Sequence, residues 1–330
     1  MRLIFIGTPA FAIPSLRRLV EGGHEVALVV TQPDRPAGRG KRLGKPPVKQ
    51  MAEEAGLPLL QPVKIQEPEM VDRLRSTRPE AIVVVAFGQI LSRAILEIPP
   101  KGCLNVHASL LPKYRGAAPI PWALIRGETV TGVTIMETGE AMDAGPILLK
   151  RETPIAAEDT AGTLHDRLAA LGAEALIEAL TALEQGQVTK IPQDEAEATY
   201  APKLTPDLGR LNWSWNATEL WNLVRGLAPD PGAYTFFRGR LVRVLGTRPA
   251  SGRPREAPGT IVGVERGEGI QVATGQGILL LTTLQPEGKR VMTAEEFARG
   301  YHAEPGSAFA PTRGQSATPR PGDSRPGRAG

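Results

Sequence analysis

Three polar side chains stand at alternate positions where an apolar stretch of the chain ends. They are Asn105, His107 and Ser109, within CLNVHASLLPKYRGAAPIPW at 103–122. Alternate residues of a strand lie on one face, so we expect the three side chains to project into one pocket. An amide and an imidazole can donate hydrogen bonds to an oxygen that becomes negative, and His can also move protons near pH 7. The spacing therefore suits chemistry on a carbonyl group.

The same residues allow a structural interpretation, because an Asn or His beside a turn more often makes local hydrogen bonds than catalyses a reaction. The longer pattern favours catalysis. NVHASLLPKYRGAAPIPWAL resembles the signature of the folate-dependent formyltransferases over about twenty consecutive positions. The resemblance implies that Asn105, His107 and a later Asp form the catalytic set. It also implies a folate site, which we assign to Phe87, Gly88, Ser109, Leu110, Leu111 and Pro112.

The later acid is assigned to Asp143, in EAMDAGPILL, with Glu137 and Glu140 as competitors. DAGP is similar to the pattern around the catalytic Asp of that family. A carboxylate beside His107 would hold the imidazole's orientation and support its protonated form. The alternative is that Asp143 only stabilises the turn before Gly145, which is a common use of Asp.

Continuous apolar runs separated by helical segments indicate a Rossmann-like α/β domain with a mostly parallel sheet. Such sheets bind ligands at the carboxyl ends of their strands, where we expect Asn105, His107 and the loop after Met136. The strands are expected at 2–7, 24–31, 57–60, 81–87, 103–106, 131–137 and 145–152, with helices ending near Val20 and covering 66–77 and 160–185.

Toward the C-terminus, a short helix at 216–227 and several short strands with Gly and Pro turns predict a small OB-like β-barrel. RGLAPDPGAYT and LQPEGKRVMTAEEFARG resemble the C-terminal domain of the formyltransferases that bind tRNA. We expect a catalytic domain at 1–190, a linker at 191–209, a tRNA-binding barrel at 210–310 and a disordered tail at 311–330.

A basic segment, DRPAGRGKRLGKPPVK at 34–49, carries six cations against the single acid Asp34. Its three Pro and three Gly residues argue against a regular helix or strand and predict a mobile loop. Such a loop is either a solvated surface feature or a contact for nucleic acid. Within the family it resembles the insertion that engages the acceptor end of initiator tRNA, which implies tRNA contacts from Arg35, Arg39, Lys41, Arg42, Leu43 and Lys45.

Composition adds few limits. The chain has 330 residues, a net charge of +4 and one cysteine, Cys103, which fits a reducing cytoplasm and a buried structural role. We find no apolar run long enough for a membrane span and no metal-ligand spacing, so we expect neither a membrane segment nor a metal. We also expect a cytoplasmic protein and a monomer.

The resemblance implies an enzyme that transfers the formyl group of 10-formyltetrahydrofolate to the α-amine of methionyl initiator tRNA. Two alternatives remain. One is another folate-dependent formyltransferase, or a formyl-folate hydrolase, that acts on a small substrate. The other is a tRNA-binding module without catalysis.

Overall fold

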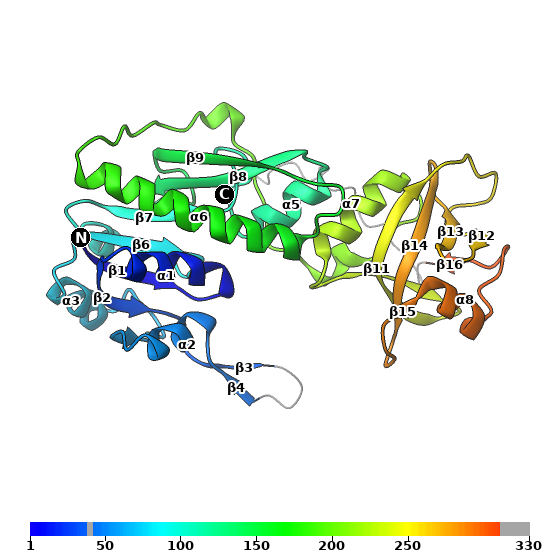
Figure 1. The fold of residues 1–330 in the computed structure, drawn as a ribbon, viewed down its shortest axis with the longest axis horizontal. Helices are drawn as coiled ribbons and strands as arrows, with labels where there is room; N and C mark the ends of the chain where they lie inside the picture. Colours follow the sequence, from blue (N-terminus) through cyan, green and yellow to red (C-terminus); the bar gives the residue numbers. More distant parts are fainter. Residues whose placement is uncertain (38–41, 311–330) are drawn as a thin grey trace, which may run out of the picture. The chain divides into compact units, whose positions relative to one another are not determined.

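The computed structural model describes residues 1–37 and 42–310, and the chain forms two compact units (Figure 1). The first unit comprises Met1–Pro119, Val130–Pro154 and His165–Ala201. The second comprises Ile120–Thr129, Ile155–Leu164 and the chain from Pro202 onward. The segment for which we expect a linker, 191–209, is thus divided between the two units. The expected tail, 311–330, lies outside the described residues.

The first unit is built on a sheet of seven strands in the order β5-β2-β1-β6-β7-β8-β9. The first five strands of that order run parallel, and β8 and β9 run antiparallel to their neighbours. The prediction of a mostly parallel α/β sheet is confirmed. The strands are β1 (Arg2–Gly7), β2 (Glu25–Val30), β5 (Leu59–Leu60), β6 (Ala81–Val85), β7 (Cys103–His107), β8 (Val130–Glu137) and β9 (Ile147–Pro154).

Helices cover both faces of this sheet. Helices α1 (Ile13–Glu21) and α6 (Ala161–Glu184) lie side by side on one face, where Arg18 of α1 pairs with Glu174 of α6 (Figure 1). Gly172 lets α6 approach the sheet closely, because a Cβ there would lie 2.8 Å from Val106 Cγ1. The opposite face is covered by α3 (Pro68–Ser76) and α4 (Arg93–Leu96).

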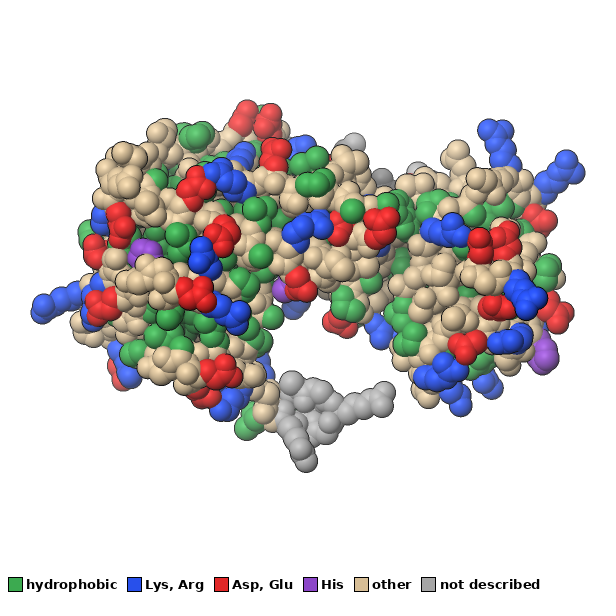
Figure 2. All heavy atoms as spheres, in the orientation of Figure 1, with side chains coloured by type: hydrophobic (Ala, Val, Ile, Leu, Met, Phe, Trp, Pro, Cys, Tyr) green, Lys and Arg blue, Asp and Glu red, His purple; other side chains and the backbone are tan. Residues whose placement is uncertain are grey.

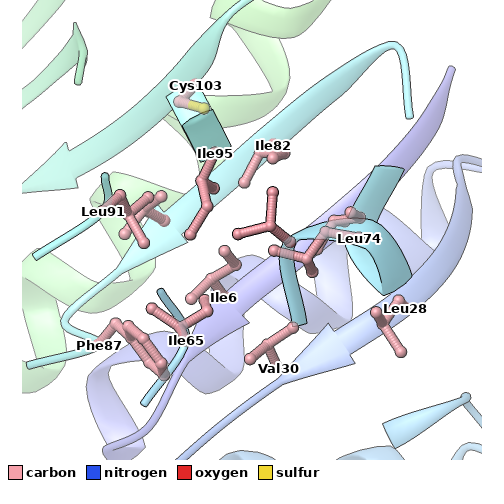
Figure 3. Packing of buried hydrophobic residues seen from close by; sticks show 13 residues of the cluster. Ile6, Leu28, Val30, Ile65, Leu74, Ile82, Phe87, Leu91, Ile95 and Cys103 are labelled. Atoms are coloured by element: carbon pink, nitrogen blue, oxygen red, sulfur yellow. The ribbon is translucent and has the colours of Figure 1, made fainter. Parts of the chain in front are cut away.

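The core beneath α3 and α4 joins alternate side chains of four parallel strands (Figure 3). Cys103 belongs to this core and is 1% exposed, and burial raises the pKa of its thiol to about 12. A thiol with that pKa stays neutral at physiological pH and packs as a small apolar group, as the sequence predicted. The strand residues of the cluster are Ile4, Ile6, Leu28, Val30, Ile82, Val84 and Cys103.

The basic segment contains regular structure, so the expectation of an irregular loop at 34–49 was wrong. Strand β3 (Arg35–Ala37) pairs antiparallel with β4 (Arg42–Gly44), and helix α2 (Pro47–Glu54) follows. Both outer edges of a two-stranded ribbon lack partners, so Pro36 is tolerated in it. Pro47 takes the first helical position, where no intrahelical N–H bond is made. Arg39 and Lys41 lie outside the described residues.

The second unit contains an antiparallel sheet in the order β12-β13-β14-β11-β10-β16, with β15 paired to β14. Its two ends meet, because Thr260 bridges Ala308 and the Ile261 amide donates to the Ser307 carbonyl. This closure confirms the expected small barrel. Its elements are α5 (Pro119–Ile125), α7 (Ala217–Leu227), β10 (Ala233–Phe237), β11 (Arg240–Ala250), β12 (Ile261–Glu265), β13 (Gly269–Ala273), β14 (Ile278–Pro286), β15 (Met292–Thr293), α8 (Ala294–Tyr301) and β16 (Phe309–Ala310).

The surface is mixed in charge. On the face shown in Figure 2, basic and acidic side chains are interspersed on each unit, as the net charge of +4 suggests. Within residues 1–37 and 42–310, no helix is long and apolar enough to cross a membrane. Over the same ranges, no group of three or more His, Cys, Asp or Glu side chains is placed to hold a metal ion.

Candidate active site

Strand β7 presents Asn105 and His107 on the same face. Cys103 of this strand packs in the core beneath α3 and α4, and Val106 faces α6 on the other side. Strand alternation therefore directs Asn105 and His107 to the face of Cys103. Ser109 lies beyond the strand end and is buried, and its Oγ donates to the Lys113 carbonyl at 2.6 Å. The first two predicted side chains project together, whereas Ser109 makes a local hydrogen bond.

Asp143 reaches this face by a route that the sequence did not reveal. Strand β8 runs antiparallel to β7, with Leu104 opposite Glu137 and His107 opposite Thr134. The loop after Met136 therefore begins beside the amino end of β7. We expected this loop at the carboxyl ends of the parallel strands, and that expectation was wrong. The loop at 138–146 then turns back. Gly145 permits a close approach to β8, because a Cβ there would lie 1.8 Å from the Glu137 carbonyl oxygen.

The three residues predicted to be catalytic converge around the Asp143 carboxylate. Its Oδ1 lies 3.4 Å from Asn105 Nδ2 and 3.7 Å from His107 Nδ1. Its Oδ2 accepts a hydrogen bond from the Gly116 amide at 2.8 Å. The side chains of His107 and Asp143 are 7% and 16% exposed. The carboxylate is thus held by groups from distant segments, which goes beyond stabilising its own turn.

The second ring nitrogen of His107 fixes the imidazole. Its Nε2 lies 2.9 Å from the Tyr114 carbonyl oxygen, and a carbonyl can only accept, so Nε2 carries a proton. In the neutral ring Nδ1 is then unprotonated and faces Asp143. The arrangement leaves Nδ1 as the nitrogen that can take up a proton and return it.

A polar network missed by the sequence analysis supports these loops. The Arg115 side chain is 2% exposed and binds both Gln193 and Glu195. The hydrogen bond with the Glu195 carboxylate raises the pKa of Arg115, and the same bond lowers the pKa of Glu195. Arg115 lies within NVHASLLPKYRGAAPIPWAL, and the sequence analysis assigned no role to it. Gln193 and Glu195 stood in the expected linker, where only the tertiary contacts reveal their partners.

The residues assigned to folate differ in accessibility. Phe87 and Leu111 are buried in core clusters, and Ser109 and Pro112 are buried as well. Gly88 is exposed, with open space where a Cβ would lie, and Leu110 is half-buried. A ligand at this edge would therefore meet Gly88 and Leu110 first. Two residues after Gly88 stands the strongly exposed Ile90, which the sequence analysis did not single out.

The paired strands β3 and β4, which we call the basic hairpin, begin and end beside the carboxyl ends of β1 and β2. A pocket of about 250 Å³ lies there, lined by Thr8, Gln32, Pro33, Arg35, Gly44, Lys45 and Pro46. Arg35 donates to Gln32 Oε1 at 3.1 Å, and Lys45 lies 2.6 Å from Glu53. Leu43 is 71% exposed. The backbone of Arg42 lies in β4.

Comparison with known families decides the chain's membership. Residues 1–180 match the formyl transferase family, and residues 203–302 match the formyl transferase C-terminal domain. The chain belongs to the formyl transferase family. The prediction of a formyltransferase is thereby confirmed, and the chain is an enzyme of this family.

Relatives of this formyl transferase align over nearly their whole length. The chain is 50% identical to the methionyl-tRNA formyltransferase of Citrifermentans bemidjiense over 306 residues, which are 93% of this chain and 95% of the relative. It is also 50% identical to the methionyl-tRNA formyltransferase of Moorella thermoacetica, covering 93% and 98% of the two chains.

Solved structures with the same fold are more distant in sequence. HypX from Aquifex aeolicus in complex with tetrahydrofolic acid has a TM-score of 0.62 and 19% identity, covering 97% of this chain and 50% of HypX. WlaRD, a sugar 3N-formyl transferase determined with dTDP and 5-N-formyl-THF, has a TM-score of 0.64 and 16% identity, covering 88% and 99%. At these identities the likeness shows the fold alone.

Proposed function

We propose that this formyl transferase moves the formyl group of 10-formyltetrahydrofolate to the α-amine of methionyl initiator tRNA. The observation that carries the proposal is the convergence of Asn105, His107 and Asp143 in one site. It is supported by relatives that are 50% identical over nearly their full length and are named methionyl-tRNA formyltransferases.

The site residues divide the work of acyl transfer. The neutral amine attacks the formyl carbon, and Asn105 donates to the oxygen that becomes negative in the tetrahedral intermediate. His107 Nδ1 takes the proton that the attacking amine loses and returns a proton to N10 of the folate as the C–N bond breaks. Asp143 holds the imidazole in place and balances its positive charge while the proton is on the ring. The products are the formylated amine and tetrahydrofolate.

Folate is assigned to the edge formed by the loop after β6 and the segment after β7. Gly88 and Leu110 would make direct contacts there. Phe87, Ser109, Leu111 and Pro112 would act by shaping the backbone, because their side chains are buried. Exposed Ile90, two residues after Gly88, offers an apolar surface for a flat ring.

The tRNA is assigned to the basic hairpin and the barrel. Arg35, Leu43 and Lys45 surround or flank the pocket at the hairpin base, and Arg39, Lys41 and Arg42 would extend the cationic surface toward phosphates. The division into a catalytic domain at 1–190, a linker at 191–209 and a tRNA-binding barrel at 210–310 belongs to this proposal.

The deciding experiment incubates the protein with 10-formyltetrahydrofolate and either charged initiator tRNA or charged elongator tRNA, and follows formyl-methionyl-tRNA. We expect product from the initiator only. A parallel reaction offers a nucleotide-linked amino sugar, and a third measures formyl release to water. Formylation of the sugar, or hydrolysis without formylated tRNA, would replace the proposal with one of the small-substrate alternatives. Binding of tRNA with no turnover in any reaction would favour a non-catalytic module.

A further inference from the structure

We propose that Gln193 is a positioning residue for formyl transfer, which holds Asp143 in register with His107. The proposal rests on the function proposed above. Gln193 lies in a polar segment that no motif marks, 50 residues beyond Asp143. Its side-chain amide joins the loop that carries Asp143 to the loop that carries Tyr114 and Gly116.

The four contacts of the Gln193 amide define this link. Its Nε2 donates to the backbone carbonyls of Asp143 and Gly145, both at 2.8 Å. Its Oε1 accepts from Arg115 Nε at 3.0 Å and from Arg115 Nη2 at 2.9 Å. These contacts use both donors and both lone pairs of the amide. The amide orientation is unambiguous, because Arg can only donate and the two carbonyls can only accept.

Arg115 is itself anchored, so the link has a fixed end. Its guanidinium is buried and also binds both carboxylate oxygens of Glu195 at 2.8 and 2.9 Å. Backbone bonds attach the same segment to the loop, because the Arg115 amide donates to the Thr199 carbonyl and the Ala201 amide donates to the Arg115 carbonyl. The Gln193 side chain therefore extends from a segment that is hydrogen-bonded to the Arg115 backbone and side chain to the loop at 138–146, which carries Asp143.

The Asp143 loop needs such a support. Asp143 has a φ of +51° and Tyr114 a φ of +62°, a left-handed backbone conformation that is strained for residues other than glycine. Residues 139–142 of the loop are exposed. Around the site the contacts form a closed ring, in which His107 meets Asp143, Gln193 binds Asp143 and Arg115, and the neighbouring Tyr114 carbonyl returns to His107. Loss of one member should displace the carboxylate.

Gln193→Glu tests this role with little change in shape. The new carboxylate still accepts from Arg115, but its second oxygen faces the carbonyls of Asp143 and Gly145 without a proton to offer. We expect kcat to fall on the order of a hundredfold, as misplacement of a catalytic group does, with KM for tRNA nearly unchanged. Gln193→Met, which removes the amide without adding charge, should show the same direction. Gln185→Glu, on an exposed Gln at the end of α6, is the matched control.

A double-variant cycle separates positioning from general destabilisation. If Gln193 acts through Asp143, then Gln193→Glu should cost little more in a chain that already carries Asp143→Asn. Full additivity of the two losses would overturn the proposal, as would an unchanged kcat in a folded Gln193→Glu chain.

Hydrogen exchange gives a measurement that does not depend on the substrate. Amides of residues 138–146 should exchange faster in Gln193→Glu than in wild type or Gln185→Glu, with the melting temperature little changed. If wild type formylates no tRNA, the proposed function fails. Even then, unchanged exchange at 138–146 would overturn the role of Gln193, and faster exchange confined to that loop would support it.

Discussion

The catalytic edge of β7 and the basic hairpin after β2 are organised in opposite ways, although both follow the carboxyl ends of parallel strands. At β7, the buried His107 and the half-buried Asn105 and Asp143 are held by partners from three separate segments, so the reacting groups are fixed before a substrate arrives. In the hairpin, β3 and β4 pair with each other and Leu43 is 71% exposed. Acyl transfer needs preorganised donors, whereas a phosphate backbone is bound by charges that can adapt to it.

The basic side chains in and around the hairpin also differ in whether an acid of the protein already pairs with them, which the sequence does not show. Lys49 lies on α2 and binds Asp34 at 2.7 and 2.9 Å, and Lys45 pairs with Glu53. Hydrogen bonds from Gln61 and Lys49 lower the pKa of Asp34. Among the basic side chains of 34–49 that the structure describes, Lys45 and Lys49 thus have carboxylate partners within the protein. The count of basic residues at 34–49 overstates the charge that is ready to meet a phosphate.

The largest expected effect is that of Asp143→Asn, which tests whether the catalytic edge depends on a fixed charge. The carboxylate accepts from Asn105 and Gly116, but an amide has only one oxygen, so its NH₂ group would face one of these donors. We expect kcat to fall on the order of a thousandfold or more, with tRNA affinity near that of wild type. Rapid-quench formylation and filter binding measure the two quantities. Glu140→Gln, on an exposed acid of the same loop, is the control. Loss of activity in Glu140→Gln with an active Asp143→Asn would mean that the wrong acid was assigned.

Asn105→Ala should have the next largest effect, because it removes one donor to the developing oxyanion. We expect kcat to fall on the order of a hundredfold. The fold should be retained, because the Asn105 side chain is partly exposed and the backbone pairing of β7 does not depend on it. Steady-state kinetics and a thermal melt test both statements. A folded variant with normal kcat would show that Asn105 does not stabilise the oxyanion.

Arg42→Ala addresses the hairpin side of the comparison. We expect kcat/KM for tRNA to fall roughly tenfold, and the slope of log affinity against log salt to flatten by about one unit, if one phosphate contact is lost. Folate titration should be unchanged. Arg73→Ala, on an exposed residue of α3, controls for net charge. Weaker folate binding with an intact salt slope would show that the hairpin does not act on nucleic acid.

Asp34→Asn should have the smallest effect and shows how the hairpin base is held. Because the folded-state pKa of Asp34 is lowered, its stabilising contribution is present above its unfolded pKa and is lost as pH falls through the folded value. The difference in unfolding free energy between wild type and variant should therefore be small at pH 7 and vanish in acid. Denaturant melts from pH 7 to pH 3 test this sign. A difference that grows as the pH falls would contradict it.

The short-range features of this protein could be predicted from the sequence because they depend on local periodicity. Apolar runs placed β1, β2, β6 and β7 within a residue or two of where they lie. Strand alternation put Asn105 and His107 on one face, and the DAGP pattern selected Asp143 among nearby acids. The strand inferences need only neighbouring residues and the geometry of a strand, whereas the choice of Asp143 depended on the resemblance of DAGP to the family's pattern.

Only the tertiary structure decided which segments meet. The reversed direction of β8 depends on its pairing with β7, and local composition carries no mark of strand direction. The ribbon formed by β3 and β4 depends on cross-strand bonds, and the Pro and Gly content of the segment argued against regular structure there. Gln193 looked like any polar residue of a linker. Its four hydrogen bonds reach residues distant in sequence, so they exist only once the fold has brought the loops together.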